Sequence, residues 1–236
     1  MFEAINPKAV LIALNYNCSS SVEFASKLEE KDLINKYNLQ SKEIKMQGQI
    51  PPEEVLNSLK GLFPCIYTAN DTKIEVIYTH NEFKLSITKL GIDEEEFDNF
   101  RDLSSDILDL KLSDVSAIGI NYSAEFDLGD VRLDILNNKI TGIPDFNKNL
   151  TFEFKLPIYY PERNLVASYR IKKVKGGDGT TEPHIYDINV NFHFDIKQLS
   201  TGEKAEKIKE ILSYDLYKEF LNKSQEFLKL NNGCCK

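Results

Sequence analysis

The stretch IALNYN at residues 12–17 decides how this chain is interpreted, because a close copy, IGINYS, stands at residues 118–123. The Asn-Tyr pair is identical in the two copies, and the neighbouring differences exchange similar small or apolar residues. Internal repeats are sought first, since a missed repeat leads to the wrong fold. The elements that follow each copy therefore decide whether the two halves share one fold.

The first half is predicted to contain a strand, a helical insert, three strands and a helix. Residues 8–17 alternate as in a half-buried strand, one side of which carries Val10, Ile12, Leu14 and Tyr16. Three serines at 19–21 can cap a helix that runs to about residue 37, and Pro-Pro-Glu-Glu starts a second short helix at 51–54. The three strands and the closing helix are expected at residues 64–68, 74–78, 83–87 and 93–110.

The second half repeats this order with longer strands. A strand at 115–123 and a short helix at 128–136 precede three further strands. The clearest, 184–196, separates apolar from polar residues, which predicts one packed face and one face in water. Its polar face holds Asp187, Asn189, Asn191, His193 and Asp195. Ser200 and Glu203 form a capping box that opens one long helix. These strands and this helix are expected at residues 150–160, 165–171, 184–196 and 200–232.

Runs of strands that are each closed by a helix place the chain in the α+β class. We expect two pseudo-symmetric repeats, residues 1–112 and 113–236. Each repeat is predicted to be a four-stranded, mostly antiparallel sheet with a long C-terminal helix packed on one face. An approximate two-fold axis would relate the repeats within one compact unit.

Composition disfavours several classes of protein. With 42% hydrophobic and 28% charged residues, the chain of 236 residues has a globular rather than a disordered composition. Its net charge of −8 disfavours nucleic acid as a partner, because phosphate backbones need clustered lysine and arginine. The sequence shows no apolar run of membrane-spanning length and no secretory signal, so we predict no membrane contact and a cytoplasmic location.

The four cysteines are expected to be reduced thiols. Cys234 and Cys235 are adjacent and have no histidine or cysteine at zinc-ligand spacing, so they are interpreted as an incidental terminus. Neither a metal site nor a cofactor is predicted. The frequent use of lysine, asparagine and isoleucine is typical of AT-rich bacterial or phage genomes.

The repeated Asn-Tyr pairs, Asn15-Tyr16 and Asn121-Tyr122, are the candidate binding residues. A buried amide must find hydrogen-bond partners or cost a few kcal/mol. In the structural interpretation, the two equivalent strands pair near the two-fold axis, and each amide bonds backbone or the other amide. In the functional interpretation, the amides contact a ligand. The structural interpretation is favoured, because polar residues in repeats usually serve packing specificity.

The best case for an enzyme is Asp145 followed by Glu153 and Lys155. This arrangement resembles the signature of restriction-endonuclease-like nucleases, in which an acid and a Glu-x-Lys on adjacent strands hold a divalent cation and orient water. Here the acid stands closer to the Glu-x-Lys than is usual for that family, and Glu82-Phe83-Lys84 satisfies the same short pattern. The chain is therefore predicted to be non-catalytic, with a metal-dependent nuclease or hydrolase as the alternative.

The duplicated strand and the order of the elements carry two resemblances. The chain resembles an uncharacterised family of bacterial proteins of about this size, although Gly119-Ile120-Asn121-Tyr122 departs from the Arg-Tyr-Ile-Asn string common in that family. Each half also resembles the fold of SecB-type export chaperones, in which a four-stranded sheet carries helices on one face. The SecB resemblance implies an apolar groove that holds extended chains.

These observations together predict a binding protein that engages a protein or peptide through a sheet face or groove. A chaperone-like, antitoxin-like or immunity-type role would suit such a protein, and it could form a homo-oligomer. A second alternative is a small-ligand binder with its pocket between the two repeats.

Overall fold

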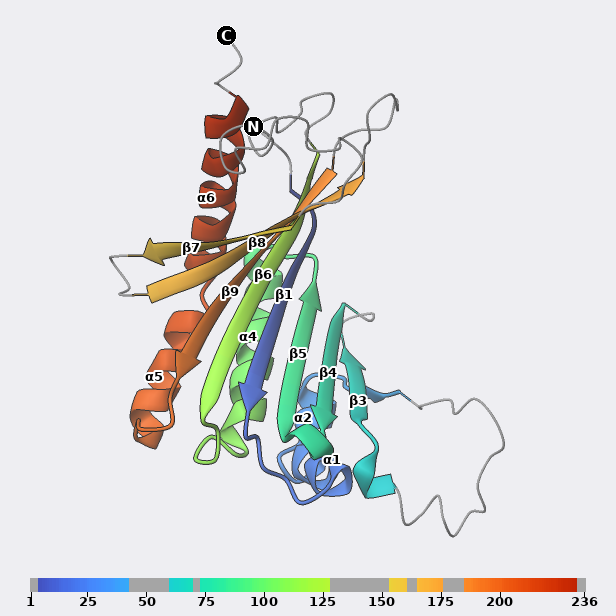
Figure 1. Ribbon diagram of the computed structural model, residues 1–236. Coiled ribbons are helices and arrows are strands. Elements are labelled where there is room, and N and C mark those ends of the chain that lie inside the picture. Colours follow the sequence, from blue (N-terminus) through green and yellow to red (C-terminus); the bar gives the residue numbers. More distant parts are fainter. Residues whose placement is uncertain are drawn as a thin grey trace. The chain divides into compact units, whose positions relative to one another are not determined.

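The computed structural model of the chain describes residues 4–42, 60–69, 73–127, 153–160, 165–175 and 185–232 (Figure 1). The described strands hydrogen-bond into one sheet in the order β2-β3-β4-β5-β1-β6-β9-β8-β7. Each pair of strands whose register is described is antiparallel. The predicted α+β class with an antiparallel sheet is therefore confirmed. None of the helices in these ranges is both long and apolar enough to cross a membrane.

The chain divides into two compact units that are discontinuous in sequence. Unit 1 consists of Met1–Lys8, Asn121–Phe192 and Tyr214–Lys236, and unit 2 consists of Ala9–Ile120 and His193–Ser213. The division falls within three strands, β1 (Ala4–Leu14), β6 (Ala117–Asp127) and β9 (Ile185–Asp195). Each of these strands therefore supplies residues to both units.

Unit 2 contains most of the first half of the chain. After β1 come α1 (Ser21–Glu30), α2 (Leu33–Lys36), β2 (Gln40–Ser41), η1 (Lys60–Leu62), β3 (Cys65–Ala69), β4 (Ile74–Thr79), η2 (His80–Glu82), β5 (Lys84–Leu90) and α4 (Glu94–Asp109). The predicted strands and the closing helix are thus present. In Figure 1, α1, α2 and α4 lie on the same side of β1, β4 and β5.

Side-chain caps explain where the helices of unit 2 begin. Ser20 and Asp93 precede α1 and α4, and each side chain accepts a hydrogen bond from a backbone N–H of the first turn. The first insert helix ends earlier than predicted, because Asp32 adopts a left-handed conformation with φ 55° that divides it into α1 and α2. The helix predicted at 51–54 lies outside the described residues.

Helix α5 (Thr201–Ile211) also belongs to unit 2. The predicted capping box is confirmed, since Ser200 and Glu203 bond each other's backbone N–H groups. The Lys204 side chain is only 4% exposed, and its ammonium donates to the carbonyl oxygens of Ser113 (3.0 Å) and Val115 (2.7 Å). A buried cation thereby fixes the chain between α4 and β6.

Unit 1 contains the longer strands of the second half. Its elements are the start of β1, most of β6 and β9, β7 (Glu153–Tyr160), β8 (Leu165–Lys175) and α6 (Tyr214–Asn232). Strand β9 alternates as predicted, with Tyr186, Ile188, Val190 and Phe192 buried. Helix α6 packs its aromatic rings on Tyr122 of β6 and Tyr169 of β8.

The single long helix predicted at 200–232 is wrong, because α5 and α6 are separate helices. Leu212 leaves the helical region with φ −84° and ψ 60°, although its side chain is buried as its place in the apolar stripe predicted. The short helix predicted at 128–136 lies outside the described residues.

Candidate functional site

The first copy of the repeated stretch ends β1 instead of lying inside it. Asn15 follows the last residue of β1, is exposed and adopts φ 59°, a left-handed conformation that asparagine tolerates better than most residues. Its Nδ2 donates to Ser116 Oγ at 2.6 Å. The predicted placement of Asn15 inside an apolar strand is therefore wrong. The turn also separates Leu14, which is 37% exposed, from Tyr16, which is fully buried. The prediction that these two residues share one face of the strand is therefore wrong.

Tyr16 is a core residue of unit 2. Its hydroxyl donates to the Ile107 carbonyl of α4 at 2.6 Å, and its ring makes edge contacts with Phe24 and Tyr78. Burial raises the pKa of Tyr16 far above its usual value, so the phenol stays protonated. Tyr78 in turn donates to the Cys18 carbonyl at 2.9 Å. These contacts anchor the loop after β1 to α4 and β4.

The second copy lies inside β6 in unit 1. Asn121 Oδ1 accepts a hydrogen bond from Asn191 Nδ2 of β9 at 2.7 Å. Tyr122 is fully buried between the sheet and α6, where it contacts the rings of Phe192 and Tyr217. Strands β1 and β6 are neighbours in the sheet, as the repeat predicted. The two amides nevertheless bond a serine and another asparagine, not each other.

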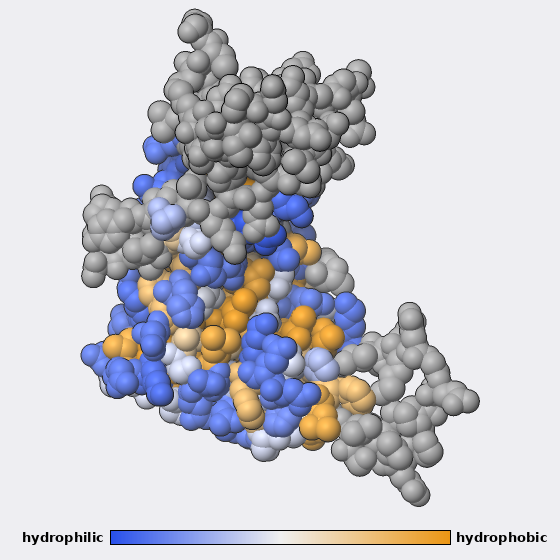
Figure 2. All heavy atoms as spheres, viewed as in Figure 1, coloured by the Kyte–Doolittle hydropathy of each residue, from blue (hydrophilic) through white to orange (hydrophobic). Residues whose placement is uncertain are grey.

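The side of the unit 2 sheet away from the helices carries half-buried apolar residues and one exposed leucine. On β1, Ala9, Leu11 and Ala13 are buried, whereas the alternate positions reach solvent. On β3 and β4, Ile66 and Ile77 are directly paired partners on this same side. We call this surface the open face, defined by Val10, Ile12, Leu14, Ile66 and Ile77. In the described part of the chain no helix lies over it, and Figure 2 shows apolar side chains gathered there.

Polar groups border the open face and also divide it, because β5 lies between β4 and β1. Strands β3, β4 and β5 place hydroxyl side chains beside the isoleucines, at Thr68, Thr79, Ser86 and Thr88. The charged pair Lys42 Nζ and Glu75 Oε1, 3.3 Å apart, lies next to them. Ser86 and Thr88 of β5 therefore separate the apolar residues of β1 from the isoleucines of β3 and β4, and the open face consists of two apolar strips with a polar strip between them.

The corresponding side of unit 1 is polar. Its β9 residues Asn189 and Asn191 are half-buried, and His193 and Asp195 farther along β9, in unit 2, are exposed as predicted. Burial raises the pKa of Asp187, and the nearby Glu125 carboxylate raises it further against the lowering effect of neighbouring cations. Glu125 accepts a hydrogen bond from Asn6 Nδ2 at 3.1 Å. This surface has the character of a solvated sheet face.

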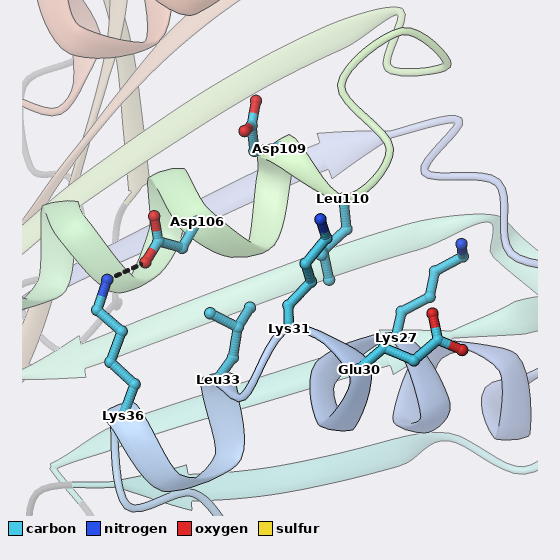
Figure 3. A pocket seen from close by; sticks show the side chains of 8 residues that line it. All are labelled: Lys27, Glu30, Lys31, Leu33, Lys36, Asp106, Asp109 and Leu110. Atoms are coloured by element: carbon cyan, nitrogen blue, oxygen red, sulfur yellow. Dashed lines mark hydrogen bonds and ion pairs between the residues drawn. The ribbon is translucent and has the colours of Figure 1, made fainter.

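A pocket of about 470 Å³ lies among the helices of unit 2 (Figure 3). Charged side chains of both signs and two leucines line the pocket. The lining residues are Lys27, Glu30, Lys31, Leu33, Lys36, Asp106, Asp109 and Leu110. Lys36 Nζ and the Tyr37 hydroxyl both contact Asp106 Oδ2 at 2.6 Å. Burial would raise the pKa of Asp106, but these two hydrogen bonds outweigh it and hold the pKa below its usual value.

The structure describes only part of the nuclease alternative. Asp145 lies outside the described residues. Glu153 and Lys155 belong to β7, where their backbones pair with Lys172 and Arg170 of β8. Within the described ranges, no group of three His, Cys, Asp or Glu side chains could hold a metal ion. Cys234 and Cys235 also lie outside the described residues.

The open face and the pocket were both missed by the sequence reasoning. The signal for the open face was present, since residues 9–14 of β1 are six consecutive apolar residues, a pattern typical of strands covered on both faces. The pocket had no such signal, because its residues are ordinary surface charges of two helical regions that are distant in sequence.

Comparison with known proteins adds no assignment. No family model matches the sequence, and no curated protein matches it.

Proposed function

We propose that this chain is a non-catalytic binding protein that holds an extended, apolar segment of a protein or peptide against the open face. The observation that carries the proposal is the two-sided apolar character of β1. Its inner residues are fully buried, while Ile12 and Leu14 point to the opposite side, which the described helices leave bare. A strand of this kind is normally covered on both faces.

A partner would gain binding free energy by removing the apolar surface of the open face from water. Each Å² of apolar surface removed from water contributes about 25 cal/mol, and complete burial of one isoleucine contributes about 1.5–3 kcal/mol. The five apolar side chains lie on β1, β3 and β4 and most are half-buried, so together they offer a partner a few kcal/mol before the costs of association. The neighbouring threonines and serine supply hydroxyl groups for the polar backbone of an extended chain.

Two features favour binding at the face over strand addition at an edge. Strand β7 is at one end of the strand order and carries Pro157, which lacks the N–H that a ladder of hydrogen bonds needs. At the other end, β2 has only two residues. Short edges and proline are the usual means by which proteins prevent strand addition.

We also propose that the chain is a tandem duplication of one sheet-and-helix module. With β1, β3, β4 and β5 matched to β6, β7, β8 and β9, the order of these eight strands reads the same from either end, and β2 is the one described strand without a counterpart. Tyr16 and Tyr122 support the match, because each is buried against the closing helix of its own half, α4 or α6. An experimental structure in which these elements fail to superpose would refute the duplication. The SecB resemblance, with its groove for extended chains, is part of this proposal.

The test of the proposed function is binding of an unfolded chain. Carboxymethylated α-lactalbumin, which cannot refold, would be titrated into the protein and followed by fluorescence anisotropy. We expect the double variant Ile12→Gln/Ile77→Gln to bind at least about tenfold more weakly, since about 1.4 kcal/mol corresponds to a factor of ten. The matched control is Ser168→Gln, an exposed position on the polar side of β8.

A thermal melt distinguishes a loss of binding in the double variant from a loss of folding. The half-exposed isoleucines contribute less to stability than the core, so the thermal midpoint of the double variant should stay close to that of the wild type. Absence of binding by the wild type, or equal binding by all three proteins, would refute the proposal. Cytoplasmic location, bacterial origin and homo-oligomer formation stay predictions.

A further inference from the structure

We propose that the pocket among α1, α2 and α4 binds a small zwitterion with an apolar body, such as a free amino acid or a short peptide with both ends unmodified. The pocket lies on the helices of unit 2 and is separate from the open face (Figure 3). Its volume of about 470 Å³ falls within the range of small-molecule sites in proteins, about 300–1,000 Å³. The proposal does not depend on the proposed function.

The charges of the pocket are arranged on two sides. The segment from α1 to α2 supplies Lys27, Lys31 and Lys36 together with Glu30, whereas α4 supplies Asp106 and Asp109. The three lysines balance the three acids, so the lining has no net charge. A ligand that carries one charge of each sign and is neutral overall matches such a lining better than a simple anion or cation.

One end of the pocket shows how the two sides are bridged. Lys36 Nζ reaches across to Asp106 Oδ2 at 2.6 Å, and Figure 3 shows this contact spanning the gap between α2 and α4. Tyr37 holds the same carboxylate at 2.6 Å through its hydroxyl. At this end, an ammonium and a carboxylate of the protein already satisfy each other.

The other end has no such bridge. Among the residues that the structure describes, the side chains of Glu30, Lys31 and Asp109 form neither a hydrogen bond nor an ion pair. Lys31 and Asp109 come from opposite sides of the pocket (Figure 3). A ligand carboxylate on Lys31 and a ligand ammonium on Asp109 would complete there the contact that Lys36 and Asp106 make at the first end.

Two leucines give the ligand its apolar part. Leu33 and Leu110 project into the space between the helices (Figure 3), and Leu33 is 5% exposed. An aliphatic ligand side chain placed on them would add apolar contact to the two charge pairs. The six charged lining residues outnumber the two leucines, so the charge pairs would select the ligand and the leucines would add contact.

Isothermal titration calorimetry with the dipeptide leucyl-leucine tests the site. N-acetyl-leucyl-leucine lacks the ammonium, and leucyl-leucine amide lacks the carboxylate. We expect both derivatives to bind the wild type more weakly than the free dipeptide, by about two- to fivefold, the size of one exposed charge pair.

Variants assign each charge to one partner. Asp109→Asn should weaken binding of the free dipeptide about two- to fivefold but leave the acetylated form unaffected. Lys31→Gln should weaken the free dipeptide likewise but leave the amide unaffected. Matched controls are Asp98→Asn on α4 and Glu29→Gln on α1, which do not line the pocket. Neither control should change any of the three affinities.

Three results would overturn the proposal. The first is absence of binding by the wild type at millimolar dipeptide. The second is equal affinity for the free, acetylated and amidated forms, which would mean that the pocket does not recognise the terminal charges of the dipeptide. The third is equal loss in the pocket variants and the controls. Thermal melts confirm that each variant is folded, as expected for exposed positions.

Discussion

Replacement of Ser104 by alanine is expected to stabilise this protein. Ser104 lies on the buried side of α4, is fully buried, and its hydroxyl has no hydrogen-bond partner among the described residues. A buried polar group without a partner costs about 1–3 kcal/mol. Alanine also favours the helix interior by about 0.5 kcal/mol. The void of one oxygen atom costs about 0.3 kcal/mol at most. The Ser104→Ala variant should therefore be about 1–3 kcal/mol more stable than the wild type.

Helix α6 offers a matched control. Ser224 is 1% exposed, and its hydroxyl donates to the Phe220 carbonyl at 2.8 Å. Ser224→Ala is the same substitution at the same burial in a helix, but it removes a hydrogen bond worth about 0.5–1.5 kcal/mol. Urea unfolding should give a higher midpoint for Ser104→Ala and an equal or lower midpoint for Ser224→Ala, with unchanged slopes. In a thermal melt, 1 kcal/mol corresponds to about 2–4 °C for a chain of this size. Equal destabilisation by both variants would show that the Ser104 hydroxyl has a partner and would refute the reasoning.

Three further predictions concern buried or paired ionisable groups. Lys204→Met should lower the free energy of unfolding by about 2–3 kcal/mol, because it leaves buried carbonyl oxygens without their donor. The control Lys209→Met, at an exposed position of α5, should have no effect. Urea unfolding measures the stability of both variants. Hydrogen bonds from Lys89 and Lys73 lower the pKa of Glu96, so Glu96→Gln should be less stable than the wild type at pH 7, with a deficit that disappears as the pH falls below 4.5 through the lowered pKa; a deficit that persists at acid pH would contradict this. Burial raises the pKa of the Cys18 thiol to about 11, so iodoacetamide at pH 8 should label Cys18 only after unfolding, as read by peptide mass spectrometry.

The helices and strands whose apolar residues recur at regular spacing could be predicted, because the burial of one face determines that spacing. Strand β9 and helix α4 each separate apolar from polar residues along their whole length, and each is present at the predicted place. The capping box of Ser200 and Glu203 could also be predicted, since both of its contacts are local in sequence. Local signals of this kind need no knowledge of the rest of the fold.

The misplaced features depend on backbone conformation, which side-chain periodicity does not report. The period correctly predicted that Leu212 is buried, but it could not show that the helix breaks there. Likewise Asn15 fits an alternating strand as a residue type, whereas its left-handed backbone ends β1 and turns Tyr16 into the core. The pocket needs the packing of α1 and α2 against α4, a tertiary fact with no local signature.

The polar face of unit 1 supports the proposal that the apolar open face binds a partner. Both units carry helices on one side of their strands, so both meet the same requirement for a buried inner face. In unit 1 the outer positions of β6 and β9 are polar, as Ser123 and Asn189 show, and the inner positions Tyr122 and Val190 are buried. A polar outer face is therefore sufficient for this kind of sheet, and the fold does not need isoleucine there. The proposed partner would cover Ile12 and Ile77, and the binding assay is designed to detect it.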